Sequence, residues 1–160
     1  MLSAIILWLF VINLGVAFGA GLYETSISVP RWLTGSPETG YRWNRAAAVE
    51  DDVGLRFWSY VSTMPLTLLT LASLITSWRV TGPVHCWWLV AALAALLDRA
   101  MTFGYFIPTM IALMRSDGSS ESDAGRKALR WVRLGYLRHA ATLIAWLAAL
   151  KAFSLFYAVR

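Results

Sequence analysis

Long runs of apolar residues dominate the chain, and polar residues separate them at short intervals. One run, from Val84 to Met114, carries an acid and a base side by side near its middle, Asp98 and Arg99. At 1.5 Å per residue a helix of this length spans roughly 46 Å, which exceeds the ~30 Å hydrocarbon core of a bilayer. The run therefore predicts a membrane-spanning helix with a charge pair at its centre.

The charge pair belongs to a polar stripe on this predicted helix. Asp98, Thr102, Tyr105 and Thr109 follow one another at helical spacing, which places them on one face. Ions near the membrane midplane are costly, so they are expected to face a protein interior. We therefore expect the stripe to face the inside of a helix bundle.

Three further apolar segments complete the pattern. The four segments together predict an all-α polytopic membrane protein, a four-transmembrane-helix bundle that forms one domain over residues 1–160. The N-terminal run lacks a basic region and is longer than a signal peptide's apolar region, so we interpret it as a retained helix. The short link between the second and third segments predicts antiparallel neighbours. The expected helices are approximately 2–24, 54–78, 84–114 and 124–158.

The first segment becomes rich in small residues toward its end. Gly15 and Gly19 form a G-x-x-x-G pair, which favours close approach of a neighbouring helix. Glu24 shares a helical face with Ala17 and Gly21, which would turn it toward the bundle. The alternative for Glu24 is an ordinary charge at the membrane boundary.

The two long connections are polar. Prolines and glycines in residues 25–54 predict interrupted structure, with a short interfacial helix over 42–52. Pro65 and Pro108 predict bends in the second and third helices. Asp123 is a candidate cap for the fourth helix, which we expect to begin near residue 124.

Composition supports the membrane assignment. The chain has 160 residues, of which 58% are hydrophobic and only 14% charged, whereas about a quarter are charged in soluble domains. Its net charge is +5, and the cations flank apolar segments, which favours anionic lipid head groups over nucleic acid as their partner. The single cysteine, Cys86, excludes an internal disulfide and a multi-cysteine metal site.

Cation distribution also predicts an orientation. Most Lys and Arg residues flank the first and third connections, and the positive-inside rule places such connections in the cytoplasm. We therefore expect a multi-pass protein of the cytoplasmic membrane, with both large loops cytoplasmic and both termini outside. The cations on the cytoplasmic side would be Arg31, Arg42, Arg45, Arg56, Arg115, Arg126, Lys127, Arg130 and Arg133.

The topology predicts a cavity that opens toward the large loops. Glu24, Arg138 and His139 are expected close to one membrane surface, with Asp98 and Arg99 about 20 Å below the end of their own helix. The polar lining of this cavity would comprise two carboxylates, two guanidinium groups, a phenol and an imidazole. These groups belong to Glu24, Asp98, Arg99, Arg138, Tyr105 and His139.

The sequence does not identify a set of metal ligands. His85 and His139 begin antiparallel helices, so they are expected on opposite membrane sides and cannot share one haem iron. A carboxylate together with His139 leaves a metal site open, but no ligand spacing supports it. The chain has no G-x-S-x-G, phosphate-loop or dinucleotide motif. The cofactor is therefore undetermined, and chemistry with no cofactor is one option.

Four sequence motifs, in order along the chain, resemble the DUF1772 family of membrane proteins, which is similar to the anthrone oxygenases. They are GAGLYETSISVPRW (19–32), RFW (56–58), RAMTFGYFIP (99–108) and WVRLGYLR (131–138). This resemblance covers nearly the whole chain. It implies four membrane helices and oxygenation of an anthrone to an anthraquinone without an evident cofactor. The matched polar positions are Tyr23, Glu24, Arg99, Thr102, Tyr105, Trp131 and Arg138.

Two hypotheses about function follow. The first is an oxidoreductase that acts on a small hydrophobic, aromatic or quinone-like molecule. In it Glu24 or His139 removes a proton and Arg99 or Arg138 stabilises the enolate, with Tyr105 as a further catalytic candidate. Substrate-binding candidates are Tyr23, Asp98, Thr102 and Trp131.

The second hypothesis is a non-catalytic membrane subunit or a small-molecule- or lipid-binding protein. In this case Asp98 and Arg99 fix the packing of the helices. Bound lipid or quinone beside Arg99 would favour the first hypothesis, and a cavity filled by side chains would favour the second. The oligomeric state is left open, with a homo-oligomer as one option.

Overall fold

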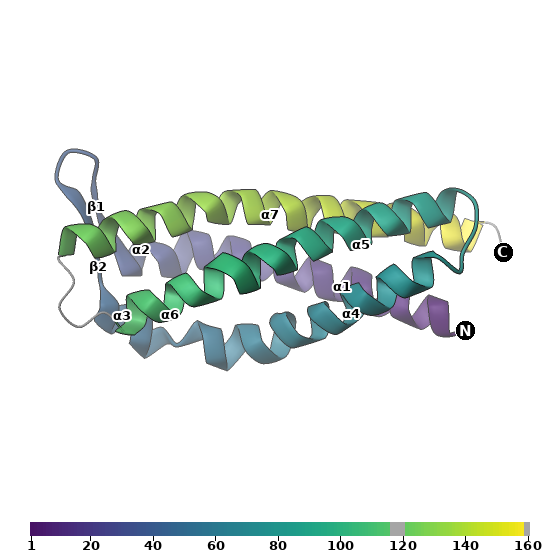
Figure 1. Cartoon of the computed structure of the whole chain (residues 1–160), viewed down its shortest axis with the longest axis horizontal. Helices are drawn as coiled ribbons and strands as arrows, with labels where there is room; N and C mark the ends of the chain where they lie inside the picture. The colour runs from purple at the N-terminus through teal and green to yellow at the C-terminus, as the bar shows by residue number, and fades with distance from the viewer. Residues whose placement is uncertain (116–120, 159–160) are drawn as a thin grey trace.

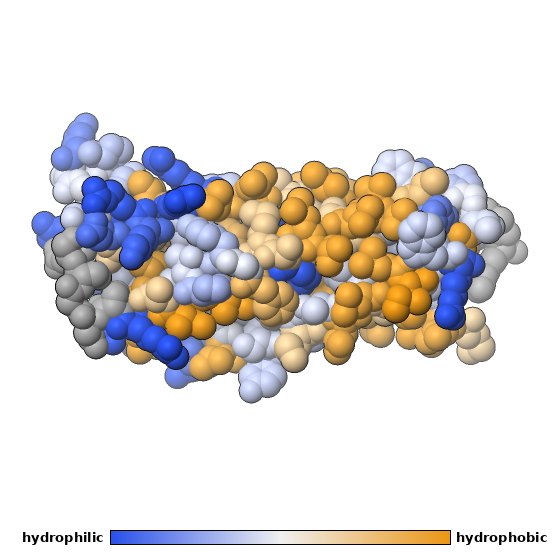
Figure 2. All heavy atoms as spheres, in the orientation of Figure 1, coloured by the Kyte–Doolittle hydropathy of each residue, from blue (hydrophilic) through white to orange (hydrophobic). Residues whose placement is uncertain are grey.

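A computed structural model describes residues 1–115 and 121–158 of the chain. Within these residues four helices are long and apolar enough to cross a membrane, and they lie along one another as an elongated bundle (Figure 1). They confirm the prediction of an all-α fold with four membrane helices. On the face shown in Figure 2, apolar residues cover most of the middle of the molecule, and hydrophilic residues gather toward its ends. The chain is therefore a multi-pass membrane protein. Its spans are Leu2–Trp32, Gly54–Ser77, Pro83–Arg115 and Ser122–Ala158.

Three of the four membrane helices contain a π-helical segment, named η here. The first helix consists of α1 (Leu2–Tyr23), η1 (Glu24–Ser28) and α2 (Val29–Trp32). A hairpin of β1 (Leu33–Ser36) and β2 (Gly40–Trp43) follows, and then α3 (Arg45–Asp51). The second helix is η2 (Gly54–Thr63) with α4 (Met64–Ser77). The third is α5 (Pro83–Met101), η3 (Thr102–Phe106) and α6 (Ile107–Arg115), and the fourth is α7 (Glu121–Ala158).

Small residues hold the four helices close together. α7 packs along α5 and α1, and α4 packs against the same two helices from the other side. Alanines from α5 and α7 meet in the centre of the bundle, where short side chains let helices approach closely. Larger side chains of α1 and α4 fill the remaining space. This core comprises Phe10, Leu14, Ala17, Leu66, Ala91, Ala95, Ala145, Ala148 and Ala149.

Each π-helical segment ends two residues before a proline. Pro30 follows η1, Pro65 follows η2 and Pro108 follows η3. A proline inside a helix lacks an N–H donor, and its ring collides with the carbonyl group four residues earlier. A wider turn with i→i+5 hydrogen bonds relieves that collision and keeps the helix continuous. The predicted bends at Pro65 and Pro108 therefore take the form of π-helical turns.

The polar connection after the first helix forms a cap over one end of the bundle. Trp43 and Arg45 donate hydrogen bonds to the carbonyl oxygens of Leu113 (3.2 Å) and Met114 (2.6 Å), near the C-terminus of α6. These contacts satisfy carbonyl groups that a helix end leaves without partners. α3 confirms the expected short helix, whereas the hairpin was not predicted. The expected interruption at Pro30 is wrong, because the helix continues through this residue to Trp32.

Two further expectations about helix ends and helix contacts are wrong. Gly15 and Gly19 do not receive a neighbouring helix backbone, because Gly15 faces the Trp146 side chain and nothing lies near Gly19. Asp123 does not precede the fourth helix, since α7 already begins at Glu121. Instead, Asp123 forms an ion pair with Arg126 within that helix.

Candidate functional site

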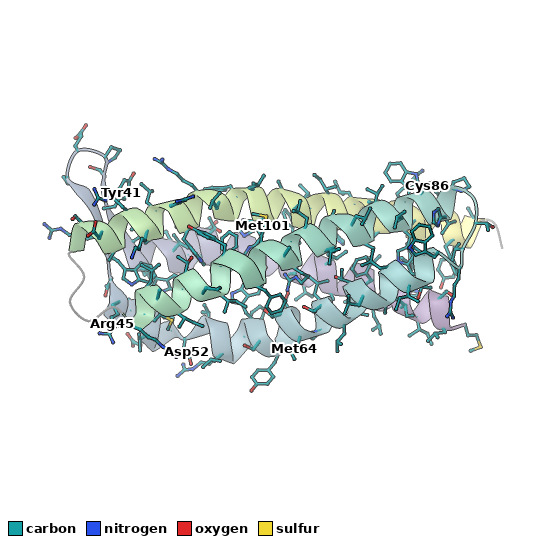
Figure 3. All side chains as sticks on the ribbon, viewed as in Figure 1. Tyr41, Arg45, Asp52, Met64, Cys86 and Met101 are labelled. Atoms are coloured by element: carbon teal, nitrogen blue, oxygen red, sulfur yellow. The ribbon has the colours of Figure 1, made fainter. Side chains whose placement is uncertain are left out.

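A cavity of about 500 Å³ lies inside the half of the bundle that carries the hairpin. All four membrane helices contribute to its wall, and α3 with the residues after it lines one end; Asp52 lies at that end (Figure 3). The three π-helical segments all contribute to the wall. A π-helical turn redirects side chains and is frequent at functional sites. The lining includes Ala17, Glu24, Trp32, Trp58, Asp98, Arg99, Thr102, Phe106, Met110, Trp131, Arg138, His139 and Thr142.

Asp98 and Arg99 form a buried ion pair on one side of the cavity. The Nε and Nη2 atoms of Arg99 both donate to Oδ2 of Asp98, with Nε at 2.9 Å. The other carboxylate oxygen, Oδ1, accepts a hydrogen bond of 3.2 Å from Thr142 of α7. The pair therefore joins α5 to α7 and meets the requirement that buried charges be compensated.

Glu24 and Arg138 form a second charged pair, with 3.8 Å between Oε2 and Nη2. Trp58 donates a hydrogen bond of 2.8 Å from Nε1 to Oε1 of Glu24. The guanidinium carbon of Arg138 lies 4.5 Å from the ring centroid of Phe106, within the range of a cation–π interaction. Of the two interpretations of Glu24, the structure therefore favours the interior one: the carboxylate is buried inside the bundle and held by two partners.

Two side chains of the cavity wall each carry a buried polar atom without a partner. Among the described residues, neither Nη1 of Arg99 nor Nε2 of His139 makes a hydrogen bond, although both side chains are more than nine-tenths buried. Gly21 makes room for the imidazole, because a Cβ at that position would lie 2.7 Å from Nε2. Buried polar groups normally have partners, so this pair of free atoms is a feature that a ligand can satisfy.

The predicted polar stripe holds only for its first two residues. Asp98 and Thr102 are buried and line the cavity, but Tyr105 and Thr109 do not line it. The π-helical turn η3 adds one residue to this turn of the helix, so the cavity face continues at Phe106 and Met110 instead. The prediction that Tyr105 surrounds the same pocket as the charged residues is therefore wrong, and its ring packs on Phe106.

Three other candidate residues occupy different surroundings. Thr102 lines the cavity, and its hydroxyl donates to the carbonyl oxygen of Asp98 within the helix. Trp131 also lines it and donates from Nε1 to the carbonyl oxygen of Phe106. Tyr23 is 64% exposed and is not among the lining residues. The structure brings together around the cavity every candidate residue except Tyr23 and Tyr105.

The expected depth of Arg138 and His139 is also wrong. Sequence reasoning placed them near the membrane surface, well above Asp98. Thr142, one helical turn beyond these residues, bonds directly to Asp98, so all of them lie at nearly one depth. The first turns of α7 pack against the hairpin at one end of the bundle. Arg138 lies several helical turns further along α7 and is therefore deep inside the bundle.

Trp58, Phe106 and Thr142 are site residues that were not among the candidates. Trp58 bonds to Glu24, Phe106 supports Arg138, and Thr142 bonds to Asp98. The spacing of prolines after each wide turn is the signal that would have identified Phe106. Nothing in the local sequence distinguishes Thr142 from other helical threonines.

The described part of the chain contains no cluster of candidate metal ligands. No group of three or more His, Cys, Asp or Glu residues comes together there. His85 lies at the other end of the bundle, beside the labelled Cys86 (Figure 3), and its Nδ1 is 2.6 Å from the Ser77 carbonyl oxygen. His139 is the histidine of the cavity.

Comparisons with protein families, curated proteins and solved structures give no match to this chain. The class of the protein, a multi-pass helical membrane protein with an internal cavity, therefore rests on the fold.

Proposed function

We propose that the chain is an integral-membrane oxidoreductase of the anthrone-oxygenase-like kind, which acts on a small aromatic or quinone-like molecule in the cavity. The observation that carries this proposal is the pair of free polar atoms, Arg99 Nη1 and His139 Nε2, in an otherwise mostly apolar pocket. The pocket volume of about 500 Å³ falls within the range of small-molecule sites.

The lining suits a flat aromatic ketone. Trp32, Phe106 and Trp131 supply aromatic surface for stacking on an apolar ring system. A guanidinium N–H from Arg99 supplies a donor for a ketone or enolate oxygen, and it lies in a site from which most water is excluded. His139 is at the same depth as Arg99, because Thr142, on the same face of α7, bonds to Asp98.

His139 is the better candidate for the base. Both carboxylate oxygens of Glu24 are already engaged, one by Trp58 and one by Arg138. Nε2 of His139 is free to accept a proton from a ligand. Glu24 then serves to hold Arg138 in place, and Arg138 adds positive charge near the developing enolate.

The proposed reaction uses dioxygen as the oxidant. His139 removes a proton from the CH₂ group of an anthrone, and the resulting enolate oxygen accepts a hydrogen bond from Arg99. The enolate carbon transfers its electrons to dioxygen and forms a C–O bond, and protonation gives a hydroperoxide. This intermediate loses water to give the anthraquinone, so that one anthrone and one dioxygen yield one quinone and one water.

The experiment is turnover of anthrone by the purified protein in lipid nanodiscs. We expect equal molar amounts of dioxygen consumed and anthraquinone formed, above the rate in empty nanodiscs. The variant His139→Gln should lose about 100-fold in rate, as is typical for loss of a general base. His85→Gln, at the opposite end of the bundle, is the matched control and should retain the full rate. No turnover by the wild-type protein would overturn the oxygenase proposal.

A second candidate function is a non-catalytic binding protein. The contacts of Asp98 favour it, because this carboxylate pairs with Arg99 and joins α5 to α7, as a purely structural residue would. Binding of anthraquinone without any turnover of anthrone would select this function over the first.

The proposal also includes the orientation of the protein in the membrane. The basic residues at the hairpin end support placing that end in the cytoplasm, by the positive-inside rule. Thr39→Cys, in the exposed turn of the hairpin and combined with Cys86→Ser, should then be labelled by a membrane-impermeant maleimide only after cells are opened. The exposed Cys86 at the other end should be labelled in intact cells. The reverse pattern would overturn this orientation.

A further inference from the structure

The cavity is long compared with a fused aromatic ring system. On the third membrane helix its wall begins at Asp98 and continues to Arg115. The distance along the helix axis between these residues is roughly 25 Å. A three-ring molecule placed beside Arg99 and His139 therefore leaves the outer part of the cavity unfilled.

Most of the polar groups lie at one end of this length, although Asp52 and Arg115 line its outer end. Both ion pairs, together with His139, surround the deep end, around Asp98 and Glu24. The wall beyond them is largely apolar. It comprises Val53, Leu55, Phe106, Ile107, Met110, Ile111 and Met114. A matching ligand therefore has a polar ring at one end and an apolar chain at the other.

Two observations indicate a lateral opening of the outer cavity between η2 and α6. Leu55 of η2 and Ile111 of α6 both line the cavity, and they are 67% and 42% exposed. η2 packs mainly on α1 and α4, whereas α6 packs on α3 and α7, so the two segments make little contact with each other. Both rims of the opening are apolar, which suits passage of a hydrocarbon chain into the surrounding bilayer.

We propose that the natural ligand is a tailed ring ketone or quinone, whose ring lies at Arg99 and His139 and whose alkyl or isoprenyl tail leaves between Leu55 and Ile111. This inference rests on the proposed function and narrows its substrate class to a membrane-resident molecule. The carbonyl oxygens of the ring accept hydrogen bonds from Nη1 of Arg99 and from His139 when its Nε2 carries the proton. The tail occupies the apolar wall and keeps water out of the reaction site.

The tail contributes shape selectivity more than affinity. Hydrocarbon tails of lipids are as apolar as leucine, so moving a tail from the bilayer into the channel gains little hydrophobic free energy. Tailed and tailless quinones should therefore bind with similar dissociation constants when concentration is expressed as mole fraction in the lipid. A side chain that obstructs the opening should weaken binding of the tailed molecule alone.

The test compares two labelled benzoquinones with the same ring, 2,3-dimethoxy-5-methyl-1,4-benzoquinone and its 6-decyl derivative. Their dissociation constants are measured by equilibrium binding to the full chain in nanodiscs. Ile111→Trp obstructs one rim of the opening, and Leu55→Trp obstructs the other at a more exposed position. Leu97→Trp is the matched control, since Leu97 is 57% exposed and lies outside the lining.

We expect both rim variants to weaken binding of the decyl quinone at least tenfold and to leave binding of the tailless quinone unchanged. The control should change neither. Unchanged binding of the decyl quinone in both folded rim variants would overturn the tail channel and leave the proposed function standing. Equal loss of both quinones would also overturn it, because the ring would then lie at the rim. Failure of both quinones to bind the wild-type protein would overturn the ligand class inferred here, whereas turnover of anthrone decides the proposed function separately.

Discussion

Asn13 donates a hydrogen bond of 2.9 Å from Nδ2 to the carbonyl oxygen of Val61, on the neighbouring membrane helix. Val61 lies four residues before Pro65, so its carbonyl is the one that the missing proline N–H would otherwise serve. A side chain of α1 thus supplies a hydrogen-bond donor for a backbone carbonyl of η2. This contact between two helices supports the π-helical segment that precedes α4.

We therefore expect Asn13→Ala to destabilise the protein by about 1–3 kcal/mol, because it removes a partner of the Val61 carbonyl within a membrane span, where no water can replace it. Thermal unfolding in detergent is the measurement. Ser73→Ala is the matched control and should be nearly neutral, since the buried Ser73 hydroxyl has no hydrogen-bond partner among the described residues. The cost of Asn13→Ala should shrink in a Pro65→Ala background, where residue 65 regains its N–H. An unchanged cost there would contradict the assigned role.

Pro108 should control which residues of α6 face the cavity. Pro108→Ala restores a donor for the Gly104 carbonyl and permits an ordinary α-helical turn in place of η3. Residues after such a turn rotate by roughly 100° relative to their present positions, since an α-helix has 3.6 residues per turn. Met110 and Ile111 would then leave the cavity wall.

Binding of the decyl quinone should accordingly fall at least tenfold in Pro108→Ala, while the protein stays folded. Pro37→Ala, in the exposed turn of the hairpin, is the control and should bind normally. If Pro108→Ala also binds normally, tertiary packing around α6 holds the π-helical turn and the proline does not.

The sequence predicts the four spans well because hydrophobic runs of membrane length have few alternative interpretations. It also predicts that Glu24, Asp98, Arg99 and Arg138 are available for one interior site, since charged residues inside such runs must face protein. The burial of all four around the cavity follows from this requirement.

Register and depth were less predictable. A periodicity of 3.6 residues cannot reveal a π-helical turn, so Tyr105 was assigned to the face that Phe106 occupies. The basic residues at the start of the fourth helix resemble a membrane boundary, but this stretch forms several helical turns that pack on the hairpin. Arg138 therefore lies deeper in the membrane than expected for a residue that follows these cations closely in the sequence.

Gly21 offers a test of His139 that leaves the histidine itself unaltered. In Gly21→Ala the new methyl group would lie 2.7 Å from Nε2, so the imidazole must move. Because the side chain can rotate, we expect a stability change of no more than about 1 kcal/mol, which the higher helix propensity of alanine partly offsets. Turnover of anthrone should fall at least tenfold.

Gly19→Ala is the matched control for this substitution. Nothing lies within 4 Å of a Cβ at Gly19, on the same helix, so stability and turnover should be maintained or slightly improved. Equal activity of the two alanine variants would remove His139 from the proposed mechanism.

Arg99 should have separable structural and functional roles. Arg99→Leu leaves Asp98 buried without its cation, which should cost about 3–5 kcal/mol of stability. The double variant Asp98→Leu with Arg99→Leu should recover much of that loss, because it removes both charges. Arg99→Lys keeps a positive charge for Asp98 but loses Nη1, the guanidinium nitrogen without a partner. We expect its free energy of unfolding to fall much less than that of Arg99→Leu, because a cation still faces Asp98, and we expect it to bind both benzoquinones at least tenfold more weakly. Melting curves and equilibrium binding on the same preparations separate the two roles. A folded Arg99→Lys protein with wild-type binding and turnover would assign Arg99 to helix packing alone.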